Sequence, residues 1–250
     1  MNRLMVSVVM PAYNCQKYIQ TAIKSVLDQS VDLELIIVED RSTDDTLKKI
    51  NSFLPDERII LIQNKCNLGV AASRNIGVNK ASGKYIAFLD SDDYWTDDKL
   101  EKQLKIMENN NAVLSSTGRQ IMDESGKLTD RYIGIPEKVT YKMLLRGNVL
   151  NTSGVMIRTD MAKKYPMTQE HLHEDYITWL SVLKEGYVAF GINEPLLKYR
   201  LMQGSKSGNK IKSAAMTFGV YRYMGYNIFK SLYYFLCYAI NGVRKYFIKG

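Results

Sequence analysis

Short apolar runs alternate with amphipathic stretches along residues 5–89 of the chain. The runs have the length and composition of buried strands, and apolar residues at helical spacing follow the first run. The pattern predicts strands at residues 5–10, 33–38, 59–63 and 85–89 and helices at residues 19–27, 44–53 and 69–81. Strands that alternate with helices predict an α/β fold, with a mostly parallel sheet flanked by helices and right-handed crossovers.

The second half of the chain is less regular. It predicts strands at residues 153–157 and 188–192 and a helix at residues 174–184. No internal repeat, low-complexity linker or domain boundary is evident before about residue 205. The length of 250 residues suits one large α/β domain, alone or with an appendage.

The apolar run at residues 85–89 ends directly in Asp90-Ser91-Asp92-Asp93. Ligands bind at the carboxyl ends of strands in an open α/β sheet, and carboxylates this close repel one another unless a cation shares them. Mg²⁺ and Mn²⁺ take oxygen ligands and commonly link one or two carboxylates to a substrate phosphate. The segment therefore predicts either a divalent metal site or a solvated acidic turn that caps the next helix.

Polar side chains also follow the first two predicted strands. Tyr13 offers a flat face for a base, Asp40 offers an acceptor for a ring N–H or a ribose hydroxyl, and Arg74 on the third helix could reach a phosphate. Each has a structural alternative: loop packing for Tyr13, a turn cap for Asp40 and a surface charge for Arg74. Because all three are expected at the sheet edge that carries the acidic cluster, together they favour a metal-assisted nucleoside-diphosphate site.

The composition, 46% hydrophobic and 24% charged, is that of an ordinary globular protein. Three widely spaced cysteines without metal-ligand spacing predict reduced thiols in a cytoplasmic protein. A signal peptide and a membrane-spanning run of about eighteen uncharged apolar residues are both missing from the pattern. The absence of G-x-G-x-x-G after a strand argues against an NAD-dependent enzyme, and PAYNCQ is not the glycine-rich loop of a sugar-nucleotide pyrophosphorylase.

The net charge of +8 comes from the end of the chain. After Glu194 there are ten Lys or Arg and no Asp or Glu, whereas residues 1–194 carry 24 basic and 26 acidic side chains. Ten Tyr or Phe residues lie among these cations from Tyr221 onward. Such a segment favours a helix that lies in a membrane interface and binds anionic lipid. Packing on the main domain and a nucleic-acid surface are the alternatives, but no nucleic-acid motif is present, so we expect no nucleic-acid partner.

Five segments, in order, resemble the motifs of family 2 glycosyltransferases with the GT-A fold. They are residues 6–14, 38–44, 67–75 and 90–93, and His173-Glu174-Asp175 followed by Trp179. Tyr199-Arg200 leading to Ser205-Lys206-Ser207 resembles the closing loop of the same family. The resemblance implies a GT-A domain at residues 1–207, with a nucleotide-binding half at about 1–110 and an acceptor-binding half at about 111–207. Residues 208–250 remain as a basic, amphipathic, membrane-associated helical tail.

The resemblance implies a UDP-sugar donor and a Mn²⁺ or Mg²⁺ cofactor. Tyr13 and Asp40 would hold the uracil or the ribose, with Pro11 and Asn14 shaping their loop. Asp92, helped by Asp90, would bind the metal that bridges the diphosphate. The other expected donor contacts are Arg74, Ser91, Asp93, Arg200 and Lys206.

Asp175 would be the general base for the acceptor hydroxyl, with its pKa raised by burial or by neighbouring Glu174. A single displacement would invert the anomeric centre. The length, the acidic triplet and the tail also resemble bacterial glucosyltransferases that extend a lipid-diphosphate-linked amino sugar in O-antigen assembly. Alternatives are a soluble or protein acceptor, a non-catalytic sugar-nucleotide-binding protein recruited to the membrane, and a helix-capping role for Glu174-Asp175.

One position departs from the family pattern. Many relatives carry a His shortly after the Tyr-Arg pair, where it completes the metal shell, but here Leu201-Met202-Gln203 follows. A thioether is a poor ligand for Mg²⁺ or Mn²⁺. We therefore expect the metal to keep more water, or Arg200 and Lys206 to help neutralise the diphosphate.

Overall fold

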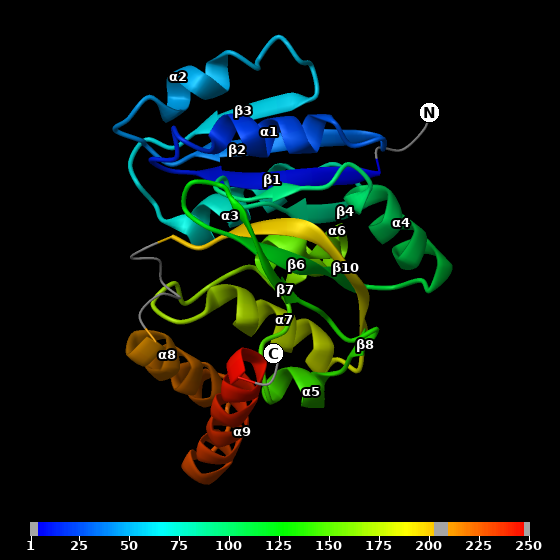
Figure 1. Ribbon diagram of the computed structural model, residues 1–250, viewed down its shortest axis with the longest axis vertical. Helices are drawn as coiled ribbons and strands as arrows, with labels where there is room; N and C mark the ends of the chain where they lie inside the picture. Colours follow the sequence, from blue (N-terminus) through cyan, green and yellow to red (C-terminus); the bar gives the residue numbers. More distant parts are fainter. Residues whose placement is uncertain (1–4, 203–209, 248–250) are drawn as a thin grey trace.

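A computed structural model describes residues 5–202 and 210–247, arranged around one mixed sheet (Figure 1). The first part contains β1 (Val6–Ala12), α1 (Ile19–Leu27), β2 (Leu33–Glu39), α2 (Thr46–Asn51), β3 (Ile59–Gln63), α3 (Val70–Lys80), β4 (Tyr85–Phe88) and β5 (Tyr94–Trp95). The middle part contains α4 (Lys99–Asn109), β6 (Leu114–Met122), β7 (Leu128–Ile133), β8 (Lys138–Val139), α5 (Tyr141–Leu145), a 3₁₀ turn (Thr152–Gly154), β9 (Met156–Arg158) and α6 (Thr159–Lys164). The last part contains α7 (Glu174–Lys184), β10 (Ala189–Arg200), α8 (Lys210–Tyr223) and α9 (Ile228–Phe247).

The sheet has the order β3-β2-β1-β4-β9-β6-β10-β5, with β7 beside β6 and β8 beside β10. β3, β2, β1 and β4 are parallel neighbours, and Val6 of β1 is in register with both Leu33 and Tyr85. β9 runs antiparallel between β4 and β6, and β10 is parallel to β6. The carboxyl ends of β1, β2 and β4 therefore lie at one edge, as the alternating pattern predicts.

Both faces of the sheet are buried, which explains the uninterrupted apolar runs. Val9 packs in a cluster with α3, α6 and α7, whereas Val8 and Met10 pack in a second cluster with α1 and α4. This alternation follows from the period of two along a strand. Each such buried side chain contributes about 1.5–3 kcal/mol, so the faces fix the strand register at the site edge.

Gly77 sets the distance between α3 and the sheet. A Cβ at this position would lie 2.4 Å from a methyl carbon of Val9 on β1. Only glycine lets the helix backbone approach β1 this closely. The close approach brings Arg74, one turn earlier on α3, down to the carboxyl edge of the strands.

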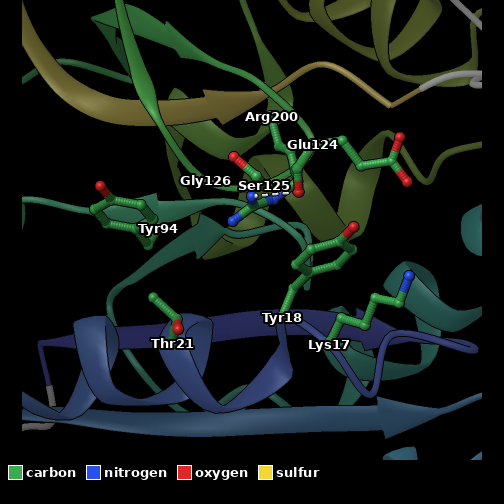
Figure 2. Close-up of a pocket in the computed structure, with 8 residues that line it drawn as sticks. All are labelled: Lys17, Tyr18, Thr21, Tyr94, Glu124, Ser125, Gly126 and Arg200. Carbon is green, nitrogen blue, oxygen red and sulfur yellow. Dashed lines mark hydrogen bonds between the residues drawn. The ribbon is translucent and has the colours of Figure 1, made fainter.

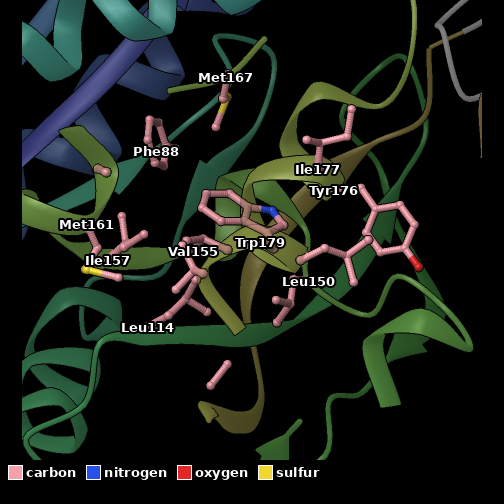
Figure 3. Packing of buried hydrophobic residues seen from close by; sticks show 14 of the residues in the cluster. Phe88, Leu114, Leu150, Val155, Ile157, Met161, Met167, Tyr176, Ile177 and Trp179 are labelled. Atoms are coloured by element: carbon pink, nitrogen blue, oxygen red, sulfur yellow. The ribbon is translucent and has the colours of Figure 1, made fainter. Parts of the chain in front are cut away.

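Trp179 is the centre of the core beneath the site (Figure 3). It is fully buried on α7, and its ring centroid lies 6.0 Å from that of Phe88 at the end of β4. Val220 and Tyr221 of α8 belong to the same cluster, and the Tyr221 hydroxyl donates a hydrogen bond to the carbonyl of Leu145. The core that supports α7 therefore extends to α8.

The predicted elements of the first half are confirmed, with small differences at the ends. The second predicted helix is shorter than residues 44–53, because Asp44 precedes it and accepts a hydrogen bond from the backbone N–H of Thr46. The predicted strand at residues 153–157 is wrong at its start, where a 3₁₀ turn precedes β9. All three cysteines are free thiols, and no helix among the described residues is both long and apolar enough to cross a membrane.

The end of the chain forms two helices that pack on the domain (Figure 1). The Tyr141 and Tyr226 hydroxyls are 2.9 Å apart, and the Phe218 and Phe235 rings of α8 and α9 meet edge to face with centroids 6.0 Å apart. The predicted boundary at residues 207/208 lies outside the described residues and stays a prediction.

Candidate active site

A cavity of about 250 Å³ opens at the carboxyl edge of β4. Most of its polar lining comes from positions that the sequence predicts to be functional. The lining residues are Val70, Arg74, Asp90, Asp92, Asn151, Thr152, His173, Glu174, Asp175, Tyr199, Arg200 and Met202. The structure thus brings together the acidic segment, the third helix, the later acidic motif and the Tyr-Arg pair, although Arg74 and Arg200 are 126 positions apart in sequence.

The three carboxylates after β4 differ in their surroundings. Asp90 and Asp92 line the cavity, whereas Asp93 is buried and accepts a hydrogen bond from the backbone N–H of Arg200 at 2.8 Å. Burial, and then the charge of Asp90, raises the pKa of Asp92 to about 6. Burial, followed by Asp92 and Asp90, raises the pKa of Asp93 well above its usual range. A cation at the cavity wall would favour the ionised form of Asp92.

Arg74 is buried between two carboxylates. Its guanidinium lies 2.6 Å from Asp90 and 3.2 Å from Glu174. Burial alone would lower the pKa of Arg74, but Asp90 and Glu174 outweigh this and hold the pKa above its ordinary value. The guanidinium thus joins the end of β4 to the first turn of α7, and Arg74 forms part of the cavity lining.

Asp175 begins α7 beside Glu174 but has different partners. Its Oδ2 accepts a hydrogen bond from the Thr152 hydroxyl at 2.7 Å, and its Oδ1 accepts one from the backbone N–H of Tyr176 at 2.7 Å. Glu174 is turned towards Arg74. The predicted helix at residues 174–184 is confirmed, and its N-terminus places Asp175 at the cavity wall.

Asp40 is almost fully buried at the end of β2. Its carboxylate accepts hydrogen bonds at 2.8 Å from the backbone N–H groups of Leu68 and Gly69, and at 2.7 Å from the Asn64 amide. Gly69 has a φ of 87°, a conformation that favours glycine. Asp40 therefore fixes the loop before α3, and its predicted contact with a nucleoside stays a prediction.

The loop after β1 lies at the same edge. Tyr13 is 49% exposed and so is available to a ligand, while Pro11 is buried within β1. Asn14 accepts a hydrogen bond from the backbone N–H of Thr43, which ties this loop to the one after β2. The loop thus presents the ring of Tyr13 at this edge, and the predicted roles of Tyr13, Pro11 and Asn14 in nucleoside binding stay predictions.

Arg200 ends β10 and is largely occupied by protein acceptors. It donates hydrogen bonds to the carbonyls of Asp92 and Glu124, and its guanidinium lies 4.2 Å from the centre of the Tyr18 ring. Ser91 is buried in hydrogen-bond contact with the Cys15 thiol. Lys206 lies outside the described residues.

A larger hollow, of about 720 Å³, lies on the other side of Arg200 (Figure 2). Tyr18, directly before α1, and Tyr94 of β5 flank it, and residues 124–126 of the β6–β7 turn close its upper side. Its lining contains none of Asp90, Asp92 and Asp175. The smaller cavity, which is lined by all three, is therefore the candidate active site.

The donor set at this cavity fits a divalent cation. Asp90 and Asp92 supply two carboxylates, and Mg²⁺ or Mn²⁺ bound through one or two carboxylates completes its shell with phosphate oxygens and water. Across residues 5–202 and 210–247, no group of three His, Cys, Asp or Glu is arranged to hold a metal. His173 instead lies 3.2 Å from the carbonyl oxygen of Ser213 on α8, and Met202 lines the cavity.

Two residues of this site carry no signal in the sequence. Thr152 lies in an irregular stretch, and only its hydrogen bond to Asp175 reveals it. Asn151 lines the cavity beside Thr152. An apolar or aromatic pattern could not have identified either of them.

Comparisons with known proteins agree with the fold. The family model "Glycosyl transferase family 2" matches residues 7–165. The chain is 41% identical over 244 residues to the putative teichuronic acid biosynthesis glycosyltransferase TuaG of Bacillus subtilis, covering 96% of this chain and 97% of TuaG. It is 34% identical over 249 residues to the Escherichia coli protein WfgD, a UDP-Glc:alpha-D-GlcNAc-diphosphoundecaprenol beta-1,3-glucosyltransferase, covering 98% of this chain and 96% of WfgD.

A solved structure confirms the predicted GT-A class. The mannosyltransferase PcManGT of Pyrobaculum calidifontis, in complex with GDP-Man and Mn²⁺, superposes with a TM-score of 0.70 at 16% identity. The superposition covers 90% of this chain and 65% of that chain. The predicted family, fold class and enzyme class are therefore confirmed, and this chain belongs to glycosyl transferase family 2.

Proposed function

We propose that this glycosyltransferase transfers glucose from UDP-glucose to a lipid-diphosphate-linked saccharide during synthesis of a bacterial surface polysaccharide. The names of TuaG and WfgD support this assignment, since one is placed in teichuronic acid synthesis and the other acts on a diphosphoundecaprenol acceptor. The observation that carries the proposal is the position of Asp175 in the same cavity as Asp90 and Asp92. A base and a diphosphate site in one cavity are what a direct sugar transfer requires.

The side chains of the cavity and of the loops at the same edge of the sheet have separate roles in the reaction. Tyr13 stacks on the uracil, and the buried Asp40 holds the loop against which the nucleoside rests. Asp92 and Asp90 would hold Mn²⁺ or Mg²⁺, which would supply Lewis-acid stabilisation of the departing diphosphate. Arg74 adds a fixed positive charge next to the same oxygens.

Asp175 accepts the proton of the acceptor hydroxyl as that oxygen attacks the anomeric carbon. The bond from that carbon to the diphosphate breaks in the same displacement, and UDP leaves with the bonding electrons. Attack from the side opposite UDP inverts the anomeric centre, so an α-linked donor gives a β-linked product. This step needs one carboxylate base and no covalent intermediate on the enzyme.

The test is UDP release from a panel of UDP-sugars, with Mn²⁺ or with EDTA, in the presence and absence of a synthetic lipid-diphosphate GlcNAc. We expect release from UDP-glucose that requires the acceptor and is lost in EDTA. Release that persists in EDTA would contradict the metal-dependent mechanism. UDP binding without release from any donor would instead support a non-catalytic binding protein, and release with a soluble saccharide alone would contradict the lipid-linked acceptor.

We also place the enzyme on an anionic membrane surface at the cytoplasmic face, where its acceptor lies. One side of α9 packs on the domain through Tyr234 and Phe235. The other side carries a stripe of apolar side chains that are 46–78% exposed: Phe229, Leu232, Tyr233, Leu236 and Ile240. Exposed Lys230 follows Phe229 in the chain, and exposed Arg222 lies in the last turn of α8. Helices with one apolar face among cations bind anionic bilayers.

Replacing Phe229 and Leu236 with serine is expected to lower binding to anionic liposomes about tenfold or more. Full burial of one such apolar side chain in the bilayer would stabilise binding by about 1.5–3 kcal/mol, and the serine variants lose this contribution. Co-sedimentation with phosphatidylglycerol vesicles measures the effect. Leu54→Ser is the matched control, since Leu54 is 41% exposed beyond α2 at the opposite end of the molecule (Figure 1). Equal binding by the double variant and the control would contradict the docking face. Point substitutions are preferable to truncation, because deleting the tail would remove Tyr221 from the core.

A further inference from the structure

The 3₁₀ turn Thr152–Gly154 lies between the two halves of the active site. Thr152, Ser153 and Gly154 are 5%, 0% and 0% exposed, although none of the three is a large apolar residue. The turn precedes β9, which pairs with β4, so it stands next to the carboxyl end of the strand that carries Asp90. Buried polar residues at such a position require partners, and the partners identify what the turn does.

On one side the turn holds the metal-binding segment. The Ser153 hydroxyl accepts a hydrogen bond from the backbone N–H of Asp90 at 3.1 Å. The Ser153 carbonyl accepts a second hydrogen bond, from the indole N–H of Trp95, at 2.7 Å. The first residue of the acidic segment, and Trp95 two positions after its last, are thus attached to a single residue of the turn.

On the other side the turn holds the base. The Thr152 hydroxyl donates a hydrogen bond to Asp175 Oδ2 at 2.7 Å, and the backbone N–H of Tyr176 donates one to Oδ1 at 2.7 Å. With a donor on each oxygen, rotation of the carboxylate plane about its terminal bond is opposed. Each oxygen keeps a second lone pair, so the carboxylate can still accept a proton from a substrate in the cavity.

The turn itself cannot shift easily. The Gln103 amide of α4 donates a hydrogen bond to the Gly154 carbonyl at 3.0 Å. A Cβ on Gly154 would lie only 3.2 Å from the Ser116 hydroxyl and 3.3 Å from the Thr117 hydroxyl. The backbone is therefore confined between β6 and α4, and the hydroxyl of Thr152 projects from a fixed point.

We infer that Thr152 is a positioning residue, whose hydroxyl holds the carboxylate of Asp175 in the orientation that receives the acceptor proton. The inference rests on the proposed role of Asp175 as general base. Through Ser153, the same turn sets the position of that carboxylate relative to the Asp90–Asp92 segment. Thr152 acts through Asp175 and takes no part in binding the nucleotide.

The test compares Thr152→Val, which removes the hydroxyl but keeps the branched shape, with Thr152→Ser, which keeps the hydroxyl. We expect Thr152→Val to lower kcat by about 10–100-fold with the KM for the UDP-sugar unchanged, since misplacing a catalytic group costs rate and not donor affinity. Thr152→Ser should restore most of kcat. Thr178→Val is the control, because the buried Thr178 hydroxyl donates only to the Glu174 carbonyl on the same helix.

Three results would overturn the inference: Thr152→Val with wild-type kcat, equal losses in the Val and Ser variants, or a loss confined to donor affinity. The thermal unfolding midpoint of each variant separates loss of the fold from a misplaced Asp175 carboxylate. If Thr152→Val unfolds, the kcat of Thr152→Ser still tests the role of the hydroxyl. If the wild-type enzyme transfers no sugar, or if Asp175→Asn transfers it normally, the proposed function fails instead. The two failures are therefore distinguishable.

Discussion

Replacing Asp175 with asparagine is expected to lower kcat for sugar transfer by about 10²–10⁴-fold, the usual contribution of a general base. The amide has nearly the same shape and can still accept the hydrogen bond from Thr152, but it cannot take up the proton of the acceptor hydroxyl. Affinity for UDP should stay close to that of the wild-type enzyme, because Asp92, Asp90 and Arg74 are unchanged. Steady-state rates and calorimetric titration with UDP measure the two effects separately.

Asp160→Asn is the control for this substitution. Asp160 occupies the first turn of α6, as Asp175 does in α7, but it is exposed and paired with Arg158. The same chemical change there should leave kcat unaltered. Near-normal turnover by Asp175→Asn would remove Asp175 from the reaction and return the Glu174-Asp175 pair to a helix-capping role.

Replacing Asp92 with alanine is expected to lower kcat/KM by about 10³-fold or more, because loss of a bound cation removes several kcal/mol of charge stabilisation from the departing diphosphate. Asp92 lines the cavity, and burial, followed by the charge of Asp90, raises its pKa to about 6, so a bound cation would favour its ionised form. The measurement is Mn²⁺-dependent transfer together with Mn²⁺ titration in the presence of UDP. Both the rate and the Mn²⁺ affinity should fall.

Asp93→Asn separates the metal site from the acidic segment as a whole. Asp93 is buried away from the cavity and accepts the backbone N–H of Arg200, a hydrogen bond that the asparagine oxygen can also accept. We expect this variant to keep most of its activity and its Mn²⁺ affinity. If Asp93→Asn and Asp92→Ala were equally inactive, the assignment of the metal to Asp92 would be contradicted.

The sequence predicts the first half of the fold well because β1, β2 and β4 are apolar on both sides. The same pattern does not predict β6, although this strand lies inside the sheet. Its buried residues include Ser115, Ser116 and Thr117, each at most 1% exposed, so the usual apolar signal is missing. Buried residues with hydroxyl side chains cannot be recognised from a pattern of apolar positions.

Likewise, only some residues of the candidate site can be recognised from the sequence. Asp92 and Asp175 are recognisable because each stands in a motif beside a predicted strand or helix. The bridge from Arg74 to Glu174 joins residues a hundred positions apart, and the Thr152 contact joins an irregular turn to a helix. The sequence supplies the chemical groups of these contacts, but their geometry depends on how β4, α3 and α7 pack.

The burial of Tyr221 also bears on how the enzyme is made. Its ring lies in the cluster that contains Phe88 and Trp179, which belong to β4 and α7. A ribosome releases the chain from its N-terminus, and domains begin to fold as they emerge. The nucleotide-binding strands can therefore assemble early, but the hydrophobic surface around α7 is not covered until α8 has left the exit tunnel. During that interval the nascent chain offers a binding surface to chaperones that the finished enzyme no longer has.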